Sequence, residues 1–209
     1  GKGISVKAKS LVVLATDDAF ITNKGPITLW ADSDVNNFGF VYLEIGSSLN
    51  SANGTAMPTN KSTTLAVTDG GKIVIGGGAA DANDSSIPGG LAQSSTVGIS
   101  GVDLRRNSKI YSGGGDISIR GKALTGTNGW RAGITMWANS QINSGTGKIY
   151  MEGDAVGNTG TWNAGIELNL ENSCTNTALA TSITSAFNDS TIPAITMICL
   201  LYTSPSPRD

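Results

Sequence analysis

A three-part repeat constrains the fold of this chain more than any other feature of its sequence. Residues 130–136 (WRAGITM) and 162–168 (WNAGIEL) align without a gap at an offset of 32 residues. Residues 108–113 (SKIYSG) and 140–145 (SQINSG) align at the same offset. A third element, G-x-I-x-I-x-G, opens each unit, as in residues 115–121 (GDISIRG). The anchor isoleucines of this opening element are Ile4, Ile27, Ile73, Ile117 and Ile149.

Each element is too short to form a helix. Its apolar residues alternate with Thr, Ser, Lys, Asp or Glu, which is the pattern of a β-strand with one buried face. Gly- and Asn-rich stretches separate the elements, where the backbone must turn. A unit of three strands cannot bury its apolar face alone, but units stacked about 4.8 Å apart pair every strand with its neighbours above and below. The sequence therefore predicts an all-β fold, a β-solenoid with about three short strands per coil, over residues 1–198.

The units are unevenly spaced, since successive anchors lie 23, 46, 44 and 32 residues apart. We expect the extra residues to bulge out as loops between strands, the largest being residues 76–98 and 52–64. A β-sandwich would also give short strands between turns, but it does not explain the recurring three-part unit. In the solenoid, two columns of isoleucine are expected in the core: Ile27, Ile73, Ile117 and Ile149 in one, and Ile134 and Ile166 in the other.

The last eleven residues, CLLYTSPSPRD, have no counterpart upstream. Back-translated in one reading frame, residues 199–209 match the transposase end and adapter used to prepare sequencing libraries. We therefore expect this tail to be foreign to the fold and to make few specific contacts, although the stretch from Met197 to Tyr202 is apolar enough to lie along the open end of the stack. We also expect the chain to be an internal fragment read from environmental DNA. Cys174 is then the only native cysteine, which excludes an intrachain disulfide or a zinc site and favours a small buried hydrophobe.

The three elements resemble the repeats of filamentous-haemagglutinin-type bacterial surface proteins and related autotransporter adhesins. The resemblance covers roughly residues 1–170 and rests on G-x-I-x-I-x-G, G-[IV]-x-[LM] and S-x-I-x-S-G. It implies a right-handed parallel β-helix, exported across the outer membrane as part of a long shaft. The match includes no secretion domain, membrane barrel or receptor-binding module.

Charge and composition exclude several partners and reactions. The net charge is −2 and the densest cationic spot is Arg105-Arg106, so nucleic acid is not an expected partner. No apolar run approaches the length of a transmembrane span. The chain has no histidine, which removes the commonest general base and any Ser-His-Asp arrangement.

Two carboxylates could still cleave a glycosidic bond. The best acidic clusters are Asp17 with Asp18, Asp32 with Asp34, and Asp81 with Asp84. All lie beside turn residues, where Asp commonly caps its own backbone, so we interpret them as turn residues.

The sequence also lacks the patterns of a calcium-binding repeat and of a phosphate-binding loop. Residues 112–117 (SGGGDI) lack the recurring Gly and Asp spacing of a calcium-binding nonapeptide repeat, and Asp32 and Asp34 complete no ligand loop. Residues 76–78 (GGG) are not followed by Lys-Ser/Thr and a helix, as a phosphate loop requires. We expect no catalytic, cofactor-binding or metal site, and no enzyme activity.

Trp130 and Trp162 share a repeat position, from which a row of aromatic rings could bind sugars. The alternative, which we favour, is that each packs over a corner of its coil. Packing is favoured still more for Trp30 and Trp137, which lie directly after strand segments.

The function predicted from the sequence is that of a non-catalytic shaft segment of a secreted adhesin at the bacterial cell surface. Its partner would be a host-cell, matrix or polysaccharide surface that the sequence does not name. The alternative is a β-helix that binds or cleaves polysaccharide. We also expect the isolated chain to associate end to end, because a solenoid without polar caps exposes unpaired strand edges.

Overall fold

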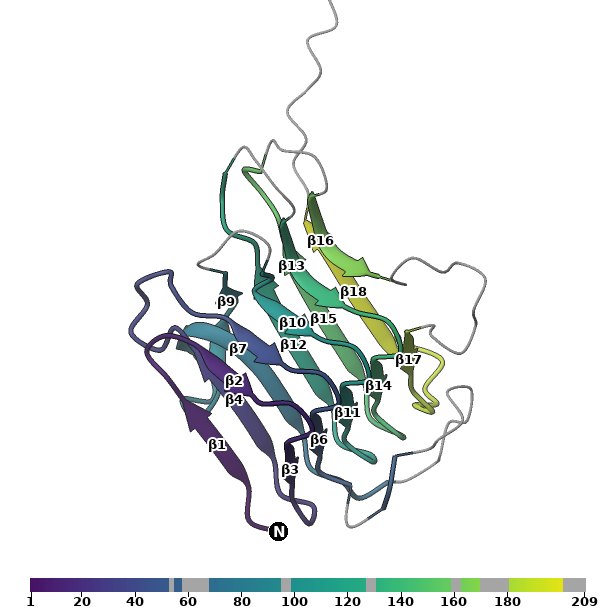
Figure 1. Ribbon diagram of the computed structural model, residues 1–209. Helices are drawn as coiled ribbons and strands as arrows, with labels where there is room; N and C mark the ends of the chain where they lie inside the picture. Colours follow the sequence, from purple (N-terminus) through teal and green to yellow (C-terminus); the bar gives the residue numbers. More distant parts are fainter. Residues whose placement is uncertain are drawn as a thin grey trace, which may run out of the picture.

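The computed structural model describes residues 1–52, 55–57, 68–94, 99–126, 131–158, 163–169 and 181–200. Over these ranges the regular structure consists of strands without a helix, arranged in three sheets (Figure 1). Each sheet takes one strand from every turn of the chain, and the strands of successive turns pair in parallel. The predicted parallel β-helix with three strands per coil is confirmed.

Sheet A is formed by the opening elements of the units. In order across the sheet, its main strands are β1 (Ile4–Lys7), β4 (Ile27–Ala31), β7 (Ile73–Ala80), β12 (Ile117–Lys122), β15 (Ile149–Asp154) and β18 (Ile195–Leu200).

Sheets B and C are formed by the second and third elements. Sheet B contains β2 (Val12–Leu14), β5 (Val41–Leu43), β10 (Val102–Leu104), β13 (Arg131–Met136) and β16 (Asn163–Leu168). Sheet C contains β3 (Ala19–Ile21), β6 (Ser48–Asn50), β11 (Lys109–Tyr111), β14 (Gln141–Asn143) and β17 (Ser182–Thr184).

The core is a set of columns that run along the stack. The anchors Ile27, Ile73, Ile117 and Ile149 lie in register in sheet A, as predicted, and each is at most 1 % exposed. Ile134 and Ile166 are paired in sheet B, which confirms the second column. Within β12 the apolar residues point inward and Ser118 and Arg120 point outward, so side-chain alternation sets which face is buried.

The bend before sheet C requires a left-handed backbone in coil after coil. The residue two positions before the sheet C strand has a positive φ in each of four coils. These residues are Asp17 (φ 60°), Gly46 (77°), Asn107 (64°) and Asn139 (61°). Glycine and, less readily, Asn and Asp adopt this conformation, which explains the residue types found at this bend. Asn139 also donates a hydrogen bond from Nδ2 to Oδ1 of Asn107, which joins two coils.

Asn139→Val should destabilise the protein by roughly 1–2 kcal/mol more than Asn139→Gly, because a β-branched residue strains the left-handed backbone. Both variants lose the hydrogen bond to Asn107, so their difference isolates the backbone cost. Urea unfolding of the two variants measures it. Equal stability would show that this bend does not require the left-handed conformation.

The bend from sheet C to sheet A is closed by a side-chain hydroxyl. In successive coils, the first residue after the sheet C strand donates a hydrogen bond to the carbonyl of a glycine two residues before the sheet A strand. These pairs are Thr22 with Gly25, Ser51 with Gly71, Ser112 with Gly115, and Ser144 with Gly147. The acceptors stack as a first glycine column: a Cβ added to Gly147 would lie 2.1 Å from the Gly115 carbonyl oxygen.

A second glycine column fills the bend from sheet A to sheet B. A Cβ on Gly121 would lie 2.2 Å from the carbonyl oxygen of Gly133, and one on Gly153 would lie 2.0 Å from that of Gly165. The two glycines of G-x-I-x-I-x-G therefore occupy the two bends at the ends of the sheet A strand. Gly115 and Gly121 do not have a positive φ. Glycine is required at these two positions because the neighbouring backbone lies too close for a side chain.

The expected loop over residues 76–98 contains strands, which corrects that prediction. β7 continues through Ala80, β8 (Pro88–Gly90) returns antiparallel to it, and β9 (Ala92–Gln93) pairs with β12. The run of glycines at residues 76–78 lets β8 approach closely, since a Cβ on Gly76 would lie 2.8 Å from the Gly90 carbonyl oxygen. Most of the second expected loop, residues 52–64, lies outside the described residues.

The tail joins the fold further than predicted. β18 runs through Cys199 and Leu200, which pair with Gly153 and Asp154 of β15. Leu200 also accepts a hydrogen bond from the Ala155 backbone at 2.9 Å. The prediction of few specific contacts is wrong for these two residues, because parallel pairing uses backbone groups that any sequence supplies. Residues 201–209 lie outside the described residues.

Candidate functional site

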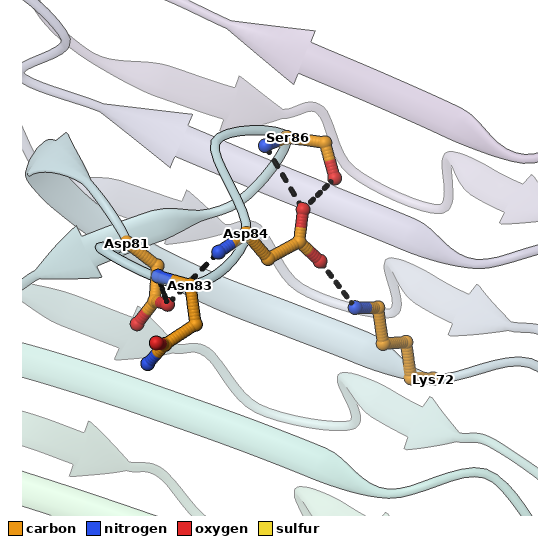
Figure 2. A network of polar contacts seen from close by, with 5 residues as sticks. All are labelled: Lys72, Asp81, Asn83, Asp84 and Ser86. Atoms are coloured by element: carbon orange, nitrogen blue, oxygen red, sulfur yellow. Dashed lines mark hydrogen bonds and ion pairs between the residues drawn. The ribbon is translucent and has the colours of Figure 1, made fainter.

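The acidic pair Asp81 and Asp84 caps the turn between β7 and β8. Figure 2 shows Asp81 Oδ1 accepting hydrogen bonds from the backbone N–H groups of Asn83 (2.9 Å) and Asp84 (3.2 Å). Asp84 Oδ1 accepts from the backbone and hydroxyl of Ser86, and Asp84 Oδ2 forms an ion pair with Lys72 Nζ at 3.0 Å. The Ser86 hydroxyl and then Lys72 lower the pKa of Asp84 to about 2. Both carboxylates are engaged by the turn, which confirms their interpretation as turn residues.

The other acidic clusters also lie in turns. Asp32 Oδ1 accepts a hydrogen bond from the Asn36 backbone at 2.9 Å, and Asp34 accepts one from the Asn36 side chain. Asp17 occupies the left-handed bend described above, and the Asp18 backbone donates to the Ala15 carbonyl.

The weak calcium signal around Asp116 has a structural explanation. Asp116 Oδ1 accepts a hydrogen bond from the Lys148 backbone of the next coil at 2.8 Å, so it joins two coils. Over the described ranges, no group of three or more Cys, Asp or Glu side chains is placed to hold a metal ion.

The tryptophans divide into two sets. Trp30 is 2 % exposed and donates a hydrogen bond from Nε1 to the Gly78 carbonyl. Lys7 Nζ lies 3.7 Å from its ring centroid. These contacts confirm that Trp30 packs against the coil. Trp130 and Trp162, for which packing over a corner of the coil was favoured over a sugar-binding row, lie outside the described residues, as does Cys174. Trp137 belongs to a cluster that the sequence did not reveal.

This cluster, which we call the Arg105 cluster, consists of Tyr42, Asp103, Arg105 and Trp137 on the outer face of sheet B. Tyr42 and Asp103 lie side by side on β5 and β10, and Arg105 and Trp137 directly follow β10 and β13. The guanidinium carbon of Arg105 lies 5.1 Å from the Tyr42 ring centroid and 4.7 Å from that of Trp137. Contacts of this kind between a cation and two rings hold the guanidinium in place.

Asp103 contacts both Trp137 and Arg105 of the cluster. Its Oδ1 accepts a hydrogen bond from Trp137 Nε1 at 2.8 Å and lies 3.5 Å from Arg105 Nε. The residue is 0 % exposed although it is on the outward row of its strand. Burial raises the pKa of Asp103 to about 6, while Arg105 and the Trp137 hydrogen bond act in the opposite direction.

The raised pKa predicts a loss of stability as pH rises. The folded protein holds the Asp103 proton more tightly than the unfolded chain, so this contribution is complete below the ordinary value of 3.8 and is lost as pH rises to about 6. Asp103→Asn keeps an acceptor for Trp137 and removes the titration. Unfolding free energies measured between pH 4 and pH 7 should therefore fall more for the parent chain than for this variant.

The control for that measurement is Asp84→Asn. The pKa of Asp84 is lowered, so its contribution is present above the ordinary value of 3.8 and is lost at lower pH, outside this window. Parallel pH profiles for the parent chain and Asp103→Asn would contradict the assignment.

Two features of the sequence concern single members of this cluster but do not show that its members meet. Arg105-Arg106 is the densest cationic spot of the sequence. Asp103, in the second element of its unit (GVDL), stands at the position that Thr135 occupies in the next unit, after Ile134. Alternation placed Asp103 on the solvent side, so its burial could not be foreseen without the side chains that cover it.

Fold and site together define a parallel β-helix protein with a solid aliphatic core. Searches of protein-family models, curated proteins and solved structures found no match to this chain. In the part of the chain that the structure describes, no helix is long and apolar enough to cross a membrane.

Proposed function

We propose that this chain is a length of the shaft of a secreted bacterial surface adhesin, in which the stacked coils themselves are the functional element. The observation that carries the proposal is that the described carboxylates of the candidate acidic and calcium sites stabilise turns and neighbouring coils. Asp81, Asp84 and Asp32 cap turns, and Asp116 joins neighbouring coils. The resemblance of the repeats to those of bacterial adhesins supports export to the cell surface.

A shaft should lengthen without loss of stability when a coil is duplicated. Ile117 and Ile149 are in register, so residues 117–148 form one complete coil that can be copied in tandem. Each copy should add about 4.8 Å to the long axis and raise the stability, because repeat proteins gain one interface per added unit. Small-angle scattering and urea unfolding measure the two effects. An insertion of the same residues in scrambled order is the control and should destabilise the chain.

The surface location and the lack of catalysis have separate tests. Fused behind a secretion signal and an outer-membrane anchor in a laboratory bacterium, the chain should be degraded by protease added to intact cells. Incubated with neutral and acidic polysaccharides, the purified chain should release no new reducing ends. Protection from the protease would argue against the surface role, and cleavage of a polysaccharide would favour the enzymatic alternative.

A second candidate function, carbohydrate binding without cleavage, is favoured by one observation. Tyr42, Arg105 and Trp137 of the Arg105 cluster line a pocket on the outer face of sheet B.

A further inference from the structure

The pocket above the Arg105 cluster has a volume of about 300 Å³. Its lining residues are Tyr42, Glu44, Ile45, Arg105, Arg106 and Trp137. Tyr42 lies within β5 and the others follow β5, β10 or β13, so three successive coils form one site.

Arg105 is held in place by contacts that leave one edge of its guanidinium unused. Its Nε donates to the Tyr42 hydroxyl and faces Asp103, and its central carbon lies 5.1 Å from the Tyr42 ring centroid and 4.7 Å from that of Trp137. Within the described ranges, Nη1 and Nη2 of Arg105 make no hydrogen bond, and its side chain is 28 % exposed. A guanidinium fixed in this way presents a planar pair of donors, which matches the two oxygens of a carboxylate.

Positive charge remains available at the pocket. Asp103 is buried beneath the cluster and approaches Arg105 only at Nε, at 3.5 Å. The Nη edge is therefore not neutralised by a carboxylate at hydrogen-bond distance. The neighbouring rings of Tyr42 and Trp137 reduce the contact of the guanidinium with water, which strengthens any ion pair formed at that edge.

Glu44 selects among possible anions. It lines the same pocket as Arg105, so a ligand that carries only a carboxylate would place a second negative charge beside it. A ligand that carries a carboxylate together with hydroxyl groups can pair its carboxylate with Arg105 and donate its hydroxyls to Glu44. The half-exposed Ile45 supplies an apolar wall for the C–H groups of a ring.

We propose that this pocket binds an acidic sugar residue of a polysaccharide, with the uronate carboxylate on the Nη edge of Arg105 and the ring hydroxyls toward Glu44. This ligand goes beyond the structural role of the shaft and does not depend on it. It gives the shaft a point of attachment along its side, separate from its ends.

Isothermal titration with a galacturonate trimer tests the proposal, with the neutral galactose trimer and a glutamate tripeptide as comparisons. The acidic sugar should bind saturably, and the other two should not. Arg105→Lys keeps the positive charge but loses the planar pair of N–H donors, and should weaken binding about tenfold or more. Arg120→Lys is the matched control, because Arg120 is engaged by Glu152 and the Gly89 carbonyl on sheet A and should not affect binding.

Arg105→Lys could also disturb the buried Asp103, so a measurement on the unaltered protein is needed. The indole N–H resonance of Trp137 should shift on addition of the galacturonate trimer, while that of Trp30, which is buried on sheet A, should not. Equal binding of the neutral trimer, preferential binding of the tripeptide, or an unmoved Trp137 resonance would overturn the proposal.

Discussion

Ile117→Ala should lower the free energy of unfolding by roughly 2–5 kcal/mol, since truncation of a buried isoleucine leaves a cavity that its neighbours fill only in part. Ile117 lies in the middle of its column, paired with Ile73 on one side and Ile149 on the other. It is 1 % exposed, so the whole side chain contributes to packing. The cavity left by the substitution cannot close fully, because hydrogen bonds of the sheet hold the strands on both sides in place.

The matched control is Ser118→Ala, one residue further along β12. Ser118 points outward, so the loss of its hydroxyl should change the stability by less than about 0.5 kcal/mol, as is usual at the surface. Urea unfolding of the parent chain and both variants measures the difference. Equal and small effects would mean that the inward and outward rows of sheet A are assigned incorrectly.

The isolated chain should associate end to end, because its last described coil leaves core positions uncovered. Ile195 is 36 % exposed and Met197 is 43 % exposed, whereas Ile149 and Met151, their partners in the preceding coil, are at most 1 % exposed. Leu168 in sheet B is likewise exposed beside the buried Met136. Apolar side chains next to unpaired strand edges favour the addition of a further strand.

Met197→Glu should therefore shift the chain toward the monomer, and Thr196→Glu should not. The two substitutions are adjacent in β18 and add the same charge, but Met197 lies on the inward row and Thr196 on the outward row. Light scattering over a range of concentrations compares them. A charged capping segment at both ends should abolish association altogether. An uncapped parent chain that stays monomeric at high concentration would show that its ends do not attract each other.

The sequence predicted the register of the stack because its apolar residues recur with two periods at once. Alternation within an element identified the buried face, and the offset between Ile117 and Ile149 identified the partner in the next coil. Neither period carries information about the hairpin of β7 and β8, which occurs in one coil only. Its signal was the run of glycines at residues 76–78, which is equally typical of an exposed loop.

The Arg105 cluster could not be predicted, for a different reason. Tyr42, Asp103, Arg105 and Trp137 come from three coils, and they meet only because loops of different length restore the same register. Spacing in the sequence therefore gave no indication that they are neighbours. The acidic clusters were interpreted correctly, because an Asp that caps a turn contacts residues two to four positions away.

The two glycine columns limit how a chain of this kind can change during evolution. Each glycine lies against the backbone of a neighbouring strand, so a side chain at one position would displace two strands at once. Copying a whole unit avoids this conflict, because it brings each glycine together with the backbone that fits it, and the 32-residue offset between Ile117 and Ile149, with segments that share four of seven residues (WRAGITM and WNAGIEL), is what such copying would leave in the sequence.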